Sequence, residues 1–271
     1  MAAASMSLST QARRVLVSGG AQRLGALLCR AFAQAGWEVW CHYQQSGAAA
    51  KALVESLRAQ GLAAHVVQAD LASEAERHGM MAHIAQESGP LHCLVNNASM
   101  FEEDAAAKLD IDSVRRQMEV NLIAPLSLSS LMAQQLPPDA EPGACSILHV
   151  LDQKVFNLNP DYFSYTVSKL ALERSVALQA QALAPRLRVC GVAPGLMFLS
   201  GPQTQENFDQ AAKVNLMQSA LDPARVAQTC VFLAENPCIT GTTLCVDNGQ
   251  HLVPLRRDVM YAVQDNLASS T

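Results

Sequence analysis

Hydrophobic residues along this chain fall into short continuous runs bounded by turn residues, without strict alternation of apolar and polar positions. Seven such runs occupy residues 13–18, 37–43, 63–68, 92–97, 145–150, 187–192 and 243–247. Strands that are apolar on both faces are typical of a parallel sheet covered by helices on each side. The pattern therefore predicts about seven parallel strands in an α/β fold.

Helical patterns lie between these runs. Behind the first run, apolar residues at i, i+3, i+4, i+7 and i+8 predict a helix packed on the sheet, which ends at Gly36; they are Leu24, Leu27, Leu28, Ala31 and Phe32. Repeated βα units with right-handed crossovers build a doubly wound, Rossmann-like sheet with helices on both faces. We expect one such domain over residues 13–253, a flexible N-terminus over 1–12 and a C-terminal tail over 254–271.

Two segments interrupt the repeat. Residues 136–143 (LPPDAEPG) read as a surface loop, and residues 196–218 separate the sixth strand from the last helix. Ligands of doubly wound sheets bind beyond the carboxyl ends of the strands. We therefore expect residues 196–218 to form an apolar lid over a substrate, and call them the lid segment.

Composition narrows the functional classes. Half of the 271 residues are hydrophobic, 16% are charged and the net charge is −5, so the chain has ample apolar surface for a core and no footprint for nucleic acid. It shows neither a signal-peptide pattern nor about 18 uninterrupted apolar residues, which predicts a cytoplasmic protein with no membrane contact. Eight cysteines stand singly, without metal-binding spacing, and read as small core residues.

A glycine-rich loop, SGGAQRLG at residues 18–25, follows the first predicted strand and leads into the first predicted helix. Gly19 and Gly25 would permit a tight turn and close approach of backbone amides to a pyrophosphate at the helix N-terminus. By itself the motif is weak, and a plain strand-to-helix turn is the alternative. Its place in a βαβ unit favours dinucleotide binding.

The end of the second predicted strand indicates which dinucleotide binds. NAD-selective folds carry an acidic residue there for the ribose 2′-hydroxyl, whereas this chain has CHYQQS at 41–46. Arg23 and Ser46 offer a cation and a hydroxyl to a 2′-phosphate, which favours NADPH. The alternative is that Arg23 is a solvated loop residue.

The stretch from 151 to 169 carries Asp152, Tyr165 and, four residues later, Lys169. A tyrosine titrates near pH 10 in water. A lysine ammonium at about 4 Å, with an effective dielectric constant near 20, would favour its phenolate by about 4 kcal/mol. Tyr165 would then exchange protons near neutral pH.

These motifs, in their order and spacing, resemble the short-chain dehydrogenase/reductase family along nearly the whole chain. Further matches are Asp70-Leu71, NNAS at 96–99, Asn121, Pro194-Gly195 and VDNG at 246–249. The resemblance implies that Asp70 and Leu71 flank the adenine, that residues 96–98, among them Asn97 and Ala98, pack along the cofactor, and that Lys169 holds the nicotinamide ribose. It also implies that Asn121 supports a proton relay and that the Pro194-Gly195 backbone lies beside the nicotinamide.

Two departures from the general family point to one branch. Arg23 stands at the middle loop glycine, and Asp152 stands where most members have serine. Together with CHYQQS and NNASMF, they resemble the pteridine reductase and dihydromonapterin reductase branch. That resemblance implies a cofactor site completed by Leu24, His42 and Tyr43, and a pterin site formed by Ser99, Phe101, Asp152, Tyr165 and Leu196.

The same resemblance implies a homotetramer. Long helices expected at about 112–136 and 163–183 would pair across subunits, and the tail at 251–260 would reach a partner's active site.

Asp152 discriminates between reactions. In a carbonyl reductase an ionised Asp152 would oppose the developing alkoxide, whereas a C=N nitrogen gains a proton as hydride reaches carbon. Asp152 would favour the protonated nitrogen or reload Tyr165, and Phe101 offers its face to a flat heteroaromatic ring. We therefore expect an NADPH-dependent reductase of a dihydropterin ring C=N.

Alternatives stay open. A protonated Asp152 would act as a hydroxyl-like donor in a carbonyl or quinone reductase, and Phe101 could serve ordinary loop packing. A non-catalytic NADP(H)-binding sensor is a third possibility, which the presence of Tyr165, Lys169 and Asn121 together disfavours.

Overall fold

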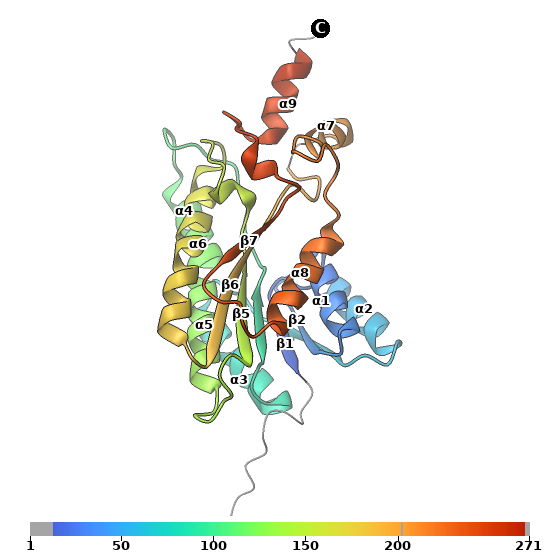
Figure 1. Cartoon of the computed structure of the whole chain (residues 1–271), viewed down its shortest axis with the longest axis vertical. Coiled ribbons are helices and arrows are strands. Elements are labelled where there is room, and N and C mark those ends of the chain that lie inside the picture. Colours follow the sequence, from blue (N-terminus) through green and yellow to red (C-terminus); the bar gives the residue numbers. More distant parts are fainter. Residues whose placement is uncertain (1–12, 202, 269–271) are drawn as a thin grey trace, which may run out of the picture.

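The seven predicted strands form one parallel sheet. The computed structural model describes residues 13–201 and 203–268, so the predicted flexible segment 1–12 lies outside the described residues. The strands are β1 (Arg14–Val17), β2 (Glu38–Tyr43), β3 (Ala64–Gln68), β4 (Cys93–Asn96), β5 (Cys145–Val150), β6 (Leu187–Pro194) and β7 (Thr243–Val246). Figure 1 shows the sheet between the helices, and the strand order is β3-β2-β1-β4-β5-β6-β7, which confirms the predicted doubly wound, Rossmann-like fold.

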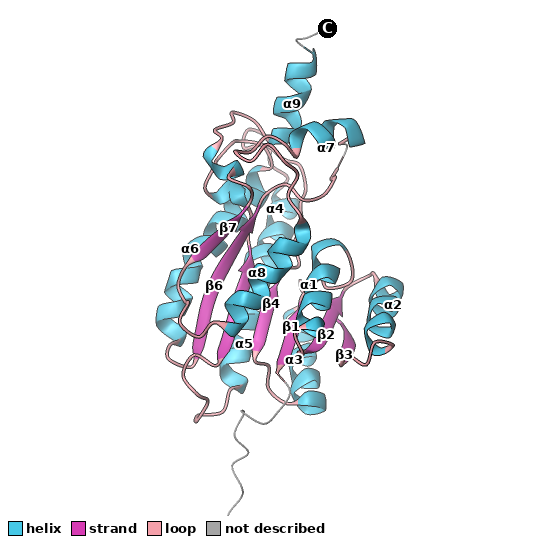
Figure 2. Cartoon of the chain, turned by 45° about the vertical axis from the view of Figure 1, so that its right-hand side comes forward, coloured by secondary structure: helices cyan, strands magenta, loops and turns pink. Residues whose placement is uncertain are grey.

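Helices cover both faces of this sheet (Figure 2). On one face lie α1 (Arg23–Gln34), α2 (Gly47–Arg58) and α8 (Pro223–Glu235); on the other lie α3 (Glu74–Ser88), α5 (Ala124–Gln135) and α6 (Phe163–Leu183). Successive strand residues alternate between the two cores, because side chains along a strand point to opposite faces. Val15 and Val17 pack under α1 and α8, and Leu16 packs under α3 and α5.

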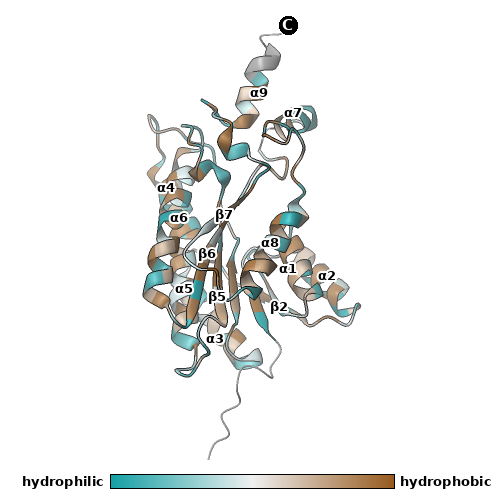
Figure 3. Cartoon of the chain, viewed as in Figure 1, coloured by the Kyte–Doolittle hydropathy of each residue, from teal (hydrophilic) through white to brown (hydrophobic). Residues whose placement is uncertain are grey.

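The strands at the centre of the molecule are mostly hydrophobic (Figure 3), as expected for a sheet buried on both sides. In α1, Leu24, Leu28 and Phe32 are buried, and Gly36 has φ +82°, so the predicted apolar stripe and the predicted glycine at the helix end are both confirmed. Six of the eight cysteines are buried, whereas Cys238 is exposed.

The predicted long helix at 112–136 is interrupted in its middle. It consists of α4 (Ile111–Met118), a π-helical turn η2 (Glu119–Ile123) and α5. A π-turn adds a residue to the helical repeat and is frequent at functional sites. Here it carries the fully buried Asn121, whereas the second long helix, α6, is continuous as predicted.

The remaining elements lie beyond the carboxyl ends of the strands, above the point where strand order reverses between β1 and β4. They are η3 (Gln153–Val155), α7 (Gln205–Ala211), η4 (Gln250–Leu252) and α9 (Val259–Ala268). Figure 1 shows α7 and α9 side by side at this end, and α7 lies within the lid segment. The segment at 136–143 is a loop, as predicted.

Two features are absent from the described residues. No helix within 13–201 and 203–268 is long and apolar enough to cross a membrane. The same part of the chain contains no group of three or more His, Cys, Asp or Glu side chains placed to hold a metal ion.

One buried arginine fastens α8 to the sheet. Arg188 of β6 donates hydrogen bonds to the carbonyls of Gly143 (2.8 Å), Leu233 (2.8 Å), Ala234 (2.8 Å) and Ile239 (3.1 Å). Replacing it by methionine would leave these acceptors without their donor. We expect Arg188→Met to lower the free energy of unfolding by about 3 kcal/mol, measured by chemical denaturation.

Arg174→Met is the matched control, because the Arg174 side chain is 81% exposed. It should change stability by less than about 0.5 kcal/mol. Equal losses in the two variants would contradict the role of Arg188.

Candidate active site

A cavity of about 860 Å³ opens where the segments that follow the carboxyl ends of the seven strands meet. This volume lies in the range of ligand pockets. The predicted site residues that line it are Gly19, Arg23, Leu24, Gly25, His42, Tyr43, Ser46, Asp70, Leu71, Asn97, Ala98, Ser99, Phe101, Asp152, Tyr165, Lys169, Pro194, Gly195 and Leu196. Only Asn121 among the predicted site residues lies behind the wall.

The glycine loop turns tightly at the base of this cavity. Gly19 has φ +61°, a conformation that favours glycine, and a Cβ on it would lie 3.0 Å from the Cα of Ala98. A Cβ on Gly25 would lie 2.0 Å from the carbonyl oxygen of Gly19. Both positions therefore require glycine, for conformation in one case and for close packing in the other.

Ser18 and Asn97 lock this loop in place. The Ser18 hydroxyl accepts hydrogen bonds from the backbone N–H groups of Asn97 (2.9 Å) and Ala98 (3.0 Å). The Asn97 side chain donates to the carbonyls of Ser18 (2.9 Å) and Gly19 (3.1 Å). The sequence analysis missed Ser18, although its place directly before Gly19 at the end of a strand was an available signal.

His42 supports the loop from behind. Its Nδ1 accepts a hydrogen bond from the Gly19 N–H (3.0 Å), so Nε2 carries the proton and donates to the carbonyl of Ala69 (3.1 Å). Burial lowers the pKa of His42, which favours this neutral form. His42, which was predicted as a cofactor-site residue, therefore positions the glycine loop.

Arg23 connects the loop to the lid segment. It has φ +50°, its guanidinium donates to the carbonyl of Leu199 (2.5 Å), and the same group lies 5.2 Å from the centre of the Phe198 ring. The side chain is exposed, so it remains accessible to a ligand in the cavity.

Other predicted cofactor residues form the adjoining wall. The Tyr43 ring packs against Gly47 at the start of α2, and the Ser46 hydroxyl makes no capping bond to that helix. Asp70 accepts a hydrogen bond from the backbone of Ala72 (2.9 Å), and Leu71 is buried. The wall therefore combines a hydroxyl, a carboxylate and apolar surface.

Asp152 and Tyr165 are in direct contact. The Tyr165 hydroxyl donates to Oδ2 of Asp152 at 2.8 Å, and Oδ1 of Asp152 accepts from the Lys154 N–H at 2.8 Å. Lys169 Nζ lies 5.8 Å from the centre of the Tyr165 ring and donates to the carbonyl of Val150 at 2.8 Å. The predicted trio is thus brought together, with the acid closest to the tyrosine.

This arrangement reverses the expected effect on Tyr165. Burial and the neighbouring Asp152 raise the pKa of Tyr165 well above its usual value, and burial lowers the pKa of Lys169 to about 8. The prediction that a lysine at about 4 Å ionises Tyr165 is therefore wrong for this structure, because Lys169 binds the Val150 carbonyl while the hydroxyl faces a carboxylate. Withdrawal from water also raises the pKa of Asp152. Tyr165 is consequently a protonated donor.

Asn121 positions the segment that carries Ser99 and Phe101. Its side-chain oxygen accepts hydrogen bonds from the Met100 N–H (2.8 Å) and the Ser99 hydroxyl (3.2 Å). Its amide donates to the Met100 carbonyl (2.9 Å) and the Ser168 hydroxyl (3.1 Å). The side chain is thus occupied with positioning, and its role in a proton relay stays a prediction.

Phe101 stands beside the Asp152–Tyr165 pair. It stacks on Tyr162, with ring centres 4.0 Å apart, and it lies nearly perpendicular to the Tyr165 ring, with ring centres 4.7 Å apart. Phe101 is 40% exposed, so part of the ring remains open to the cavity. The sequence analysis missed Tyr162 as the support of this ring.

The opposite wall is built by the end of β6 and by η4. The Gly195 N–H donates to the Val246 carbonyl (3.1 Å), and the Leu196 N–H donates to the side-chain oxygen of Gln250 (2.8 Å). Gln250 is buried and orients the start of the lid segment. No motif drew attention to it, because its contact is to a residue 54 positions away.

The tail completes the cavity from within the same chain. Leu255, Asp258 and Val259 line the cavity. We call residues 254–261 the C-terminal segment. The structure places this tail over the site of its own chain, and its reach into a partner's site stays a prediction.

The family of this chain is shown by a family model that matches all the strands after β1 and most of the residues that line the cavity. A family model described as enoyl-(acyl carrier protein) reductase matches residues 19–251, from the glycine loop to η4. The chain belongs to the short-chain dehydrogenase/reductase family. The family membership predicted from the sequence is confirmed.

Similar proteins share its length as well as its fold. A structure of FolM alternative dihydrofolate reductase 1 from Brucella canis complexed with NADP has a TM-score of 0.84 and 37% identity, covering 89% of this chain and 94% of that one. Dihydromonapterin reductase of Escherichia coli is 27% identical over 90% of this chain and 98% of its own. A blue fluorescent protein from a metagenomic library, in complex with NADPH, has a TM-score of 0.81 and 26% identity, covering 89% and 98%.

Close packing at Gly25 makes the loop sensitive to a single methyl group. In a short-chain reductase of this architecture, we expect Gly25→Ala to displace the Gly19 carbonyl, since the added Cβ would lie 2.0 Å from it. Overpacking of this kind costs about 1–3 kcal/mol, which corresponds to a loss of NADPH affinity of about 5-fold to about 150-fold. Fluorescence titration measures this affinity.

Gly79→Ala is the control, because a Cβ there would meet no atom within 4 Å. It should leave NADPH affinity unchanged. Unaltered binding in Gly25→Ala would show that the loop tolerates the methyl group.

Proposed function

We propose that this short-chain reductase uses NADPH to reduce the ring C=N bond of a dihydropterin. The observation that carries the proposal is the 2.8 Å hydrogen bond from the Tyr165 hydroxyl to the Asp152 carboxylate, in a dinucleotide-binding cavity and beside the open ring of Phe101. The dihydromonapterin reductase of Escherichia coli and the Brucella dihydrofolate reductase bound to NADP support the same chemistry.

The cavity fits a nicotinamide dinucleotide. The Gly19 turn leaves no room for a side chain and brings backbone N–H groups to the helix N-terminus, where a pyrophosphate would lie. Lys169 would hold the nicotinamide ribose, and Arg23 with Ser46 would receive the 2′-phosphate. When bound, the cofactor supplies a hydride to the substrate carbon.

The protein supplies the proton. Tyr165 keeps its proton because burial and Asp152 raise its pKa, and it donates this proton to the ring nitrogen as hydride reaches the adjacent carbon. One C–H and one N–H bond form and the C=N π bond breaks. Asp152, whose pKa is raised by withdrawal from water, returns a proton to Tyr165 and regains it from solvent.

The surroundings suit a flat substrate. Phe101 presents a partly exposed ring, and Leu196, Met197 and Phe198 of the lid segment line the same cavity. We assign residues 13–253 to the reductase domain, with 196–218 as its substrate lid. The C-terminal segment closes the remaining side.

The outer faces of three helical elements support a homotetramer. Ile111 on α4 is 52% exposed, Ile123 at the end of η2 is 44% exposed and Leu178 on α6 is 66% exposed. Such residues favour pairing of these faces across subunits. The eight free cysteines are typical of a reducing compartment, which supports the cytoplasm as the location.

The proposal predicts a specific loss in Asp152→Ser. Wild-type protein should oxidise NADPH with dihydrobiopterin or dihydromonapterin, and the variant should lose at least about a hundredfold in kcat, because a serine cannot return a proton to Tyr165. Asp139→Ser, at an exposed position in the 136–143 loop, should retain full activity. Stopped-flow absorbance at the NADPH band measures the rate.

Ketones and quinones belong in the same assay. Turnover of ketones alone, retained or improved in Asp152→Ser, would refute pterin reduction and identify a carbonyl reductase in which Asp152 acts as a protonated donor. NADP(H) binding without turnover of any substrate would identify a sensor.

Arg23 gives a second prediction, for cofactor choice. Arg23→Gln removes the cation proposed to bind the 2′-phosphate, so the ratio of kcat/KM for NADPH over NADH should fall about tenfold or more. Arg115→Gln, on a side chain that is 75% exposed on α4, is the control and should leave the ratio unchanged. An unchanged ratio in Arg23→Gln would place the phosphate elsewhere.

A further inference from the structure

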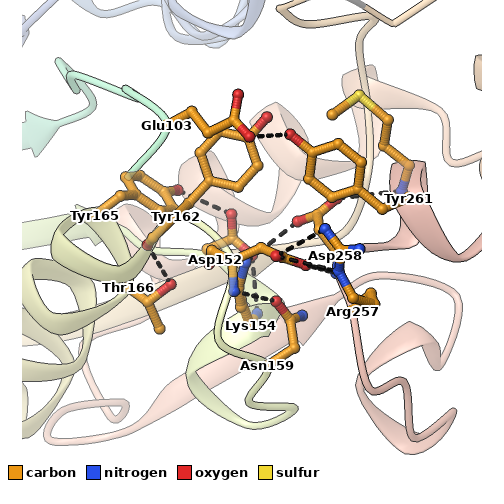
Figure 4. Close-up of polar contacts among 12 residues, drawn as sticks. Glu103, Asp152, Lys154, Asn159, Tyr162, Tyr165, Thr166, Arg257, Asp258 and Tyr261 are labelled. Carbon is orange, nitrogen blue, oxygen red and sulfur yellow. Dashed lines mark hydrogen bonds and ion pairs between the residues drawn. The ribbon is translucent and has the colours of Figure 1, made fainter. Parts of the chain in front are cut away.

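A second carboxylate, Asp258, lines the cavity beside the catalytic pair and takes no part in the proposed proton transfer. It forms an ion pair with Lys154, whose ammonium lies 3.3 Å from Oδ2 of Asp258 and donates to the Asp161 carbonyl at 2.7 Å. The Lys154 side chain is only 4% exposed. Figure 4 shows this pair directly next to Asp152 and Tyr165.

We propose that the Lys154–Asp258 ion pair is a positioning element that controls how tightly Asp152 holds its proton. This inference rests on the proposed function, in which Asp152 returns a proton to Tyr165. Neither Lys154 nor Asp258 needs to touch the substrate for this role.

Lys154 reaches the two carboxylates with different groups. Its backbone N–H donates to Oδ1 of Asp152 at 2.8 Å, while its side chain extends to Asp258. The short turn η3 fixes this division, because Asp152 caps the turn and Lys154 lies within it. A charge on Lys154 therefore acts on both acids from one fixed place.

Asp258 is held just as firmly. Its backbone N–H donates to Oδ2 of Asp161 at 2.7 Å, and its Oδ1 accepts from the Met260 N–H at 3.2 Å. The Arg257 guanidinium pairs with Asp161 at 3.0 Å. These contacts keep the Asp258 carboxylate over the cavity, so it is a fixed negative charge as long as the C-terminal segment lies in place.

Four ionisable side chains surround Asp152 from three elements. Tyr165 and Lys169 come from α6, Lys154 comes from η3, and Asp258 comes from the C-terminal segment. Burial is the largest cause of the raised pKa of Asp152; Asp258 raises it further, while the Tyr165 hydrogen bond and the Lys154 ammonium lower it. Asp258 also raises the pKa of Tyr165.

The two members of the ion pair thus act in opposite directions on the same proton. Removing Asp258 leaves the Lys154 ammonium unopposed, which lowers the pKa of Asp152. Removing Lys154 leaves Asp258 unopposed, which raises it. Because reduction needs a protonated Asp152, the rate falls as pH rises through this pKa, and the two substitutions should move that fall to lower and to higher pH respectively.

The pair also ties proton transfer to the C-terminal segment. Leu255 and Val259, on either side of Asp258, line the cavity together with it. The charge that adjusts Asp152 is therefore in position only while this segment closes the cavity. A substrate bound beneath the C-terminal segment therefore encounters Asp152 with its pKa set by Asp258.

The test compares Asp258→Asn, Lys154→Met and the double variant with wild-type protein. We measure the pH dependence of kcat for a dihydropterin and, in the unliganded protein, the titration of the Asp152 carboxyl carbon by ¹³C NMR, assigned with Asp152→Asn. We expect shifts of about one pH unit, downward in Asp258→Asn and upward in Lys154→Met, with the double variant close to wild type.

Controls separate this effect from a loss of structure. Asp112→Asn, on a side chain that is 74% exposed on α4, should shift neither titration. Thermal unfolding checks that each variant is folded, and Asp258→Asn keeps an oxygen for the Met260 N–H. If Lys154→Met fails to fold, Asp258→Asn still tests whether the Asp152 titration shifts to lower pH.

The outcomes are distinct. Shifts in the same direction, or no shift of the Asp152 resonance in folded Asp258→Asn, would overturn the role of the ion pair. The expected opposite NMR shifts in a protein that reduces no pterin would refute the proposed substrate while supporting the control of Asp152 by the pair.

Discussion

The hydrogen bond from the Tyr165 hydroxyl to the Asp152 carboxylate is the interaction on which the rest of this site depends. It places an acid next to a buried tyrosine, and burial together with that acid keeps the tyrosine protonated near neutral pH. A site built this way favours donation of a proton to a substrate over stabilisation of an oxyanion. The same cavity is lined by Phe101, by the Lys154–Asp258 ion pair and by the lid segment, so each of them acts on a substrate held next to that contact.

The backbone imposes the second constraint. Parallel strands bring their carboxyl ends to one edge, and the reversal of strand order between β1 and β4 opens a crevice there. Within that crevice, Ser18 and Asn97 hold the glycine loop by hydrogen bonds, and His42 supports Gly19 from the neighbouring strand. A loop fixed on both sides offers its N–H groups without reorganisation when a phosphate binds.

Two expectations were revised where a contact depended on distant parts of the chain. Lys169 follows Tyr165 by one helical turn, which suggested direct contact, but its ammonium binds the Val150 carbonyl. The helix expected at 112–136 is present but widens into a π-turn at Asn121, whose amide is bonded to Met100 and Ser168. In both cases the spacing along the sequence was right and the bonding partner was not visible in it.

The sequence by itself determined the sheet, the glycine loop and the groups proposed to be catalytic, because apolar runs, required glycines and a Tyr-x-x-x-Lys helix turn are local patterns. Only the tertiary structure decided the pKa values of those groups. Lys154 and Asp258 are 104 residues apart in the chain, yet they meet at 3.3 Å beside Asp152. Proton affinities depend on burial and on charges a few ångströms away, and these quantities exist only once the chain has folded.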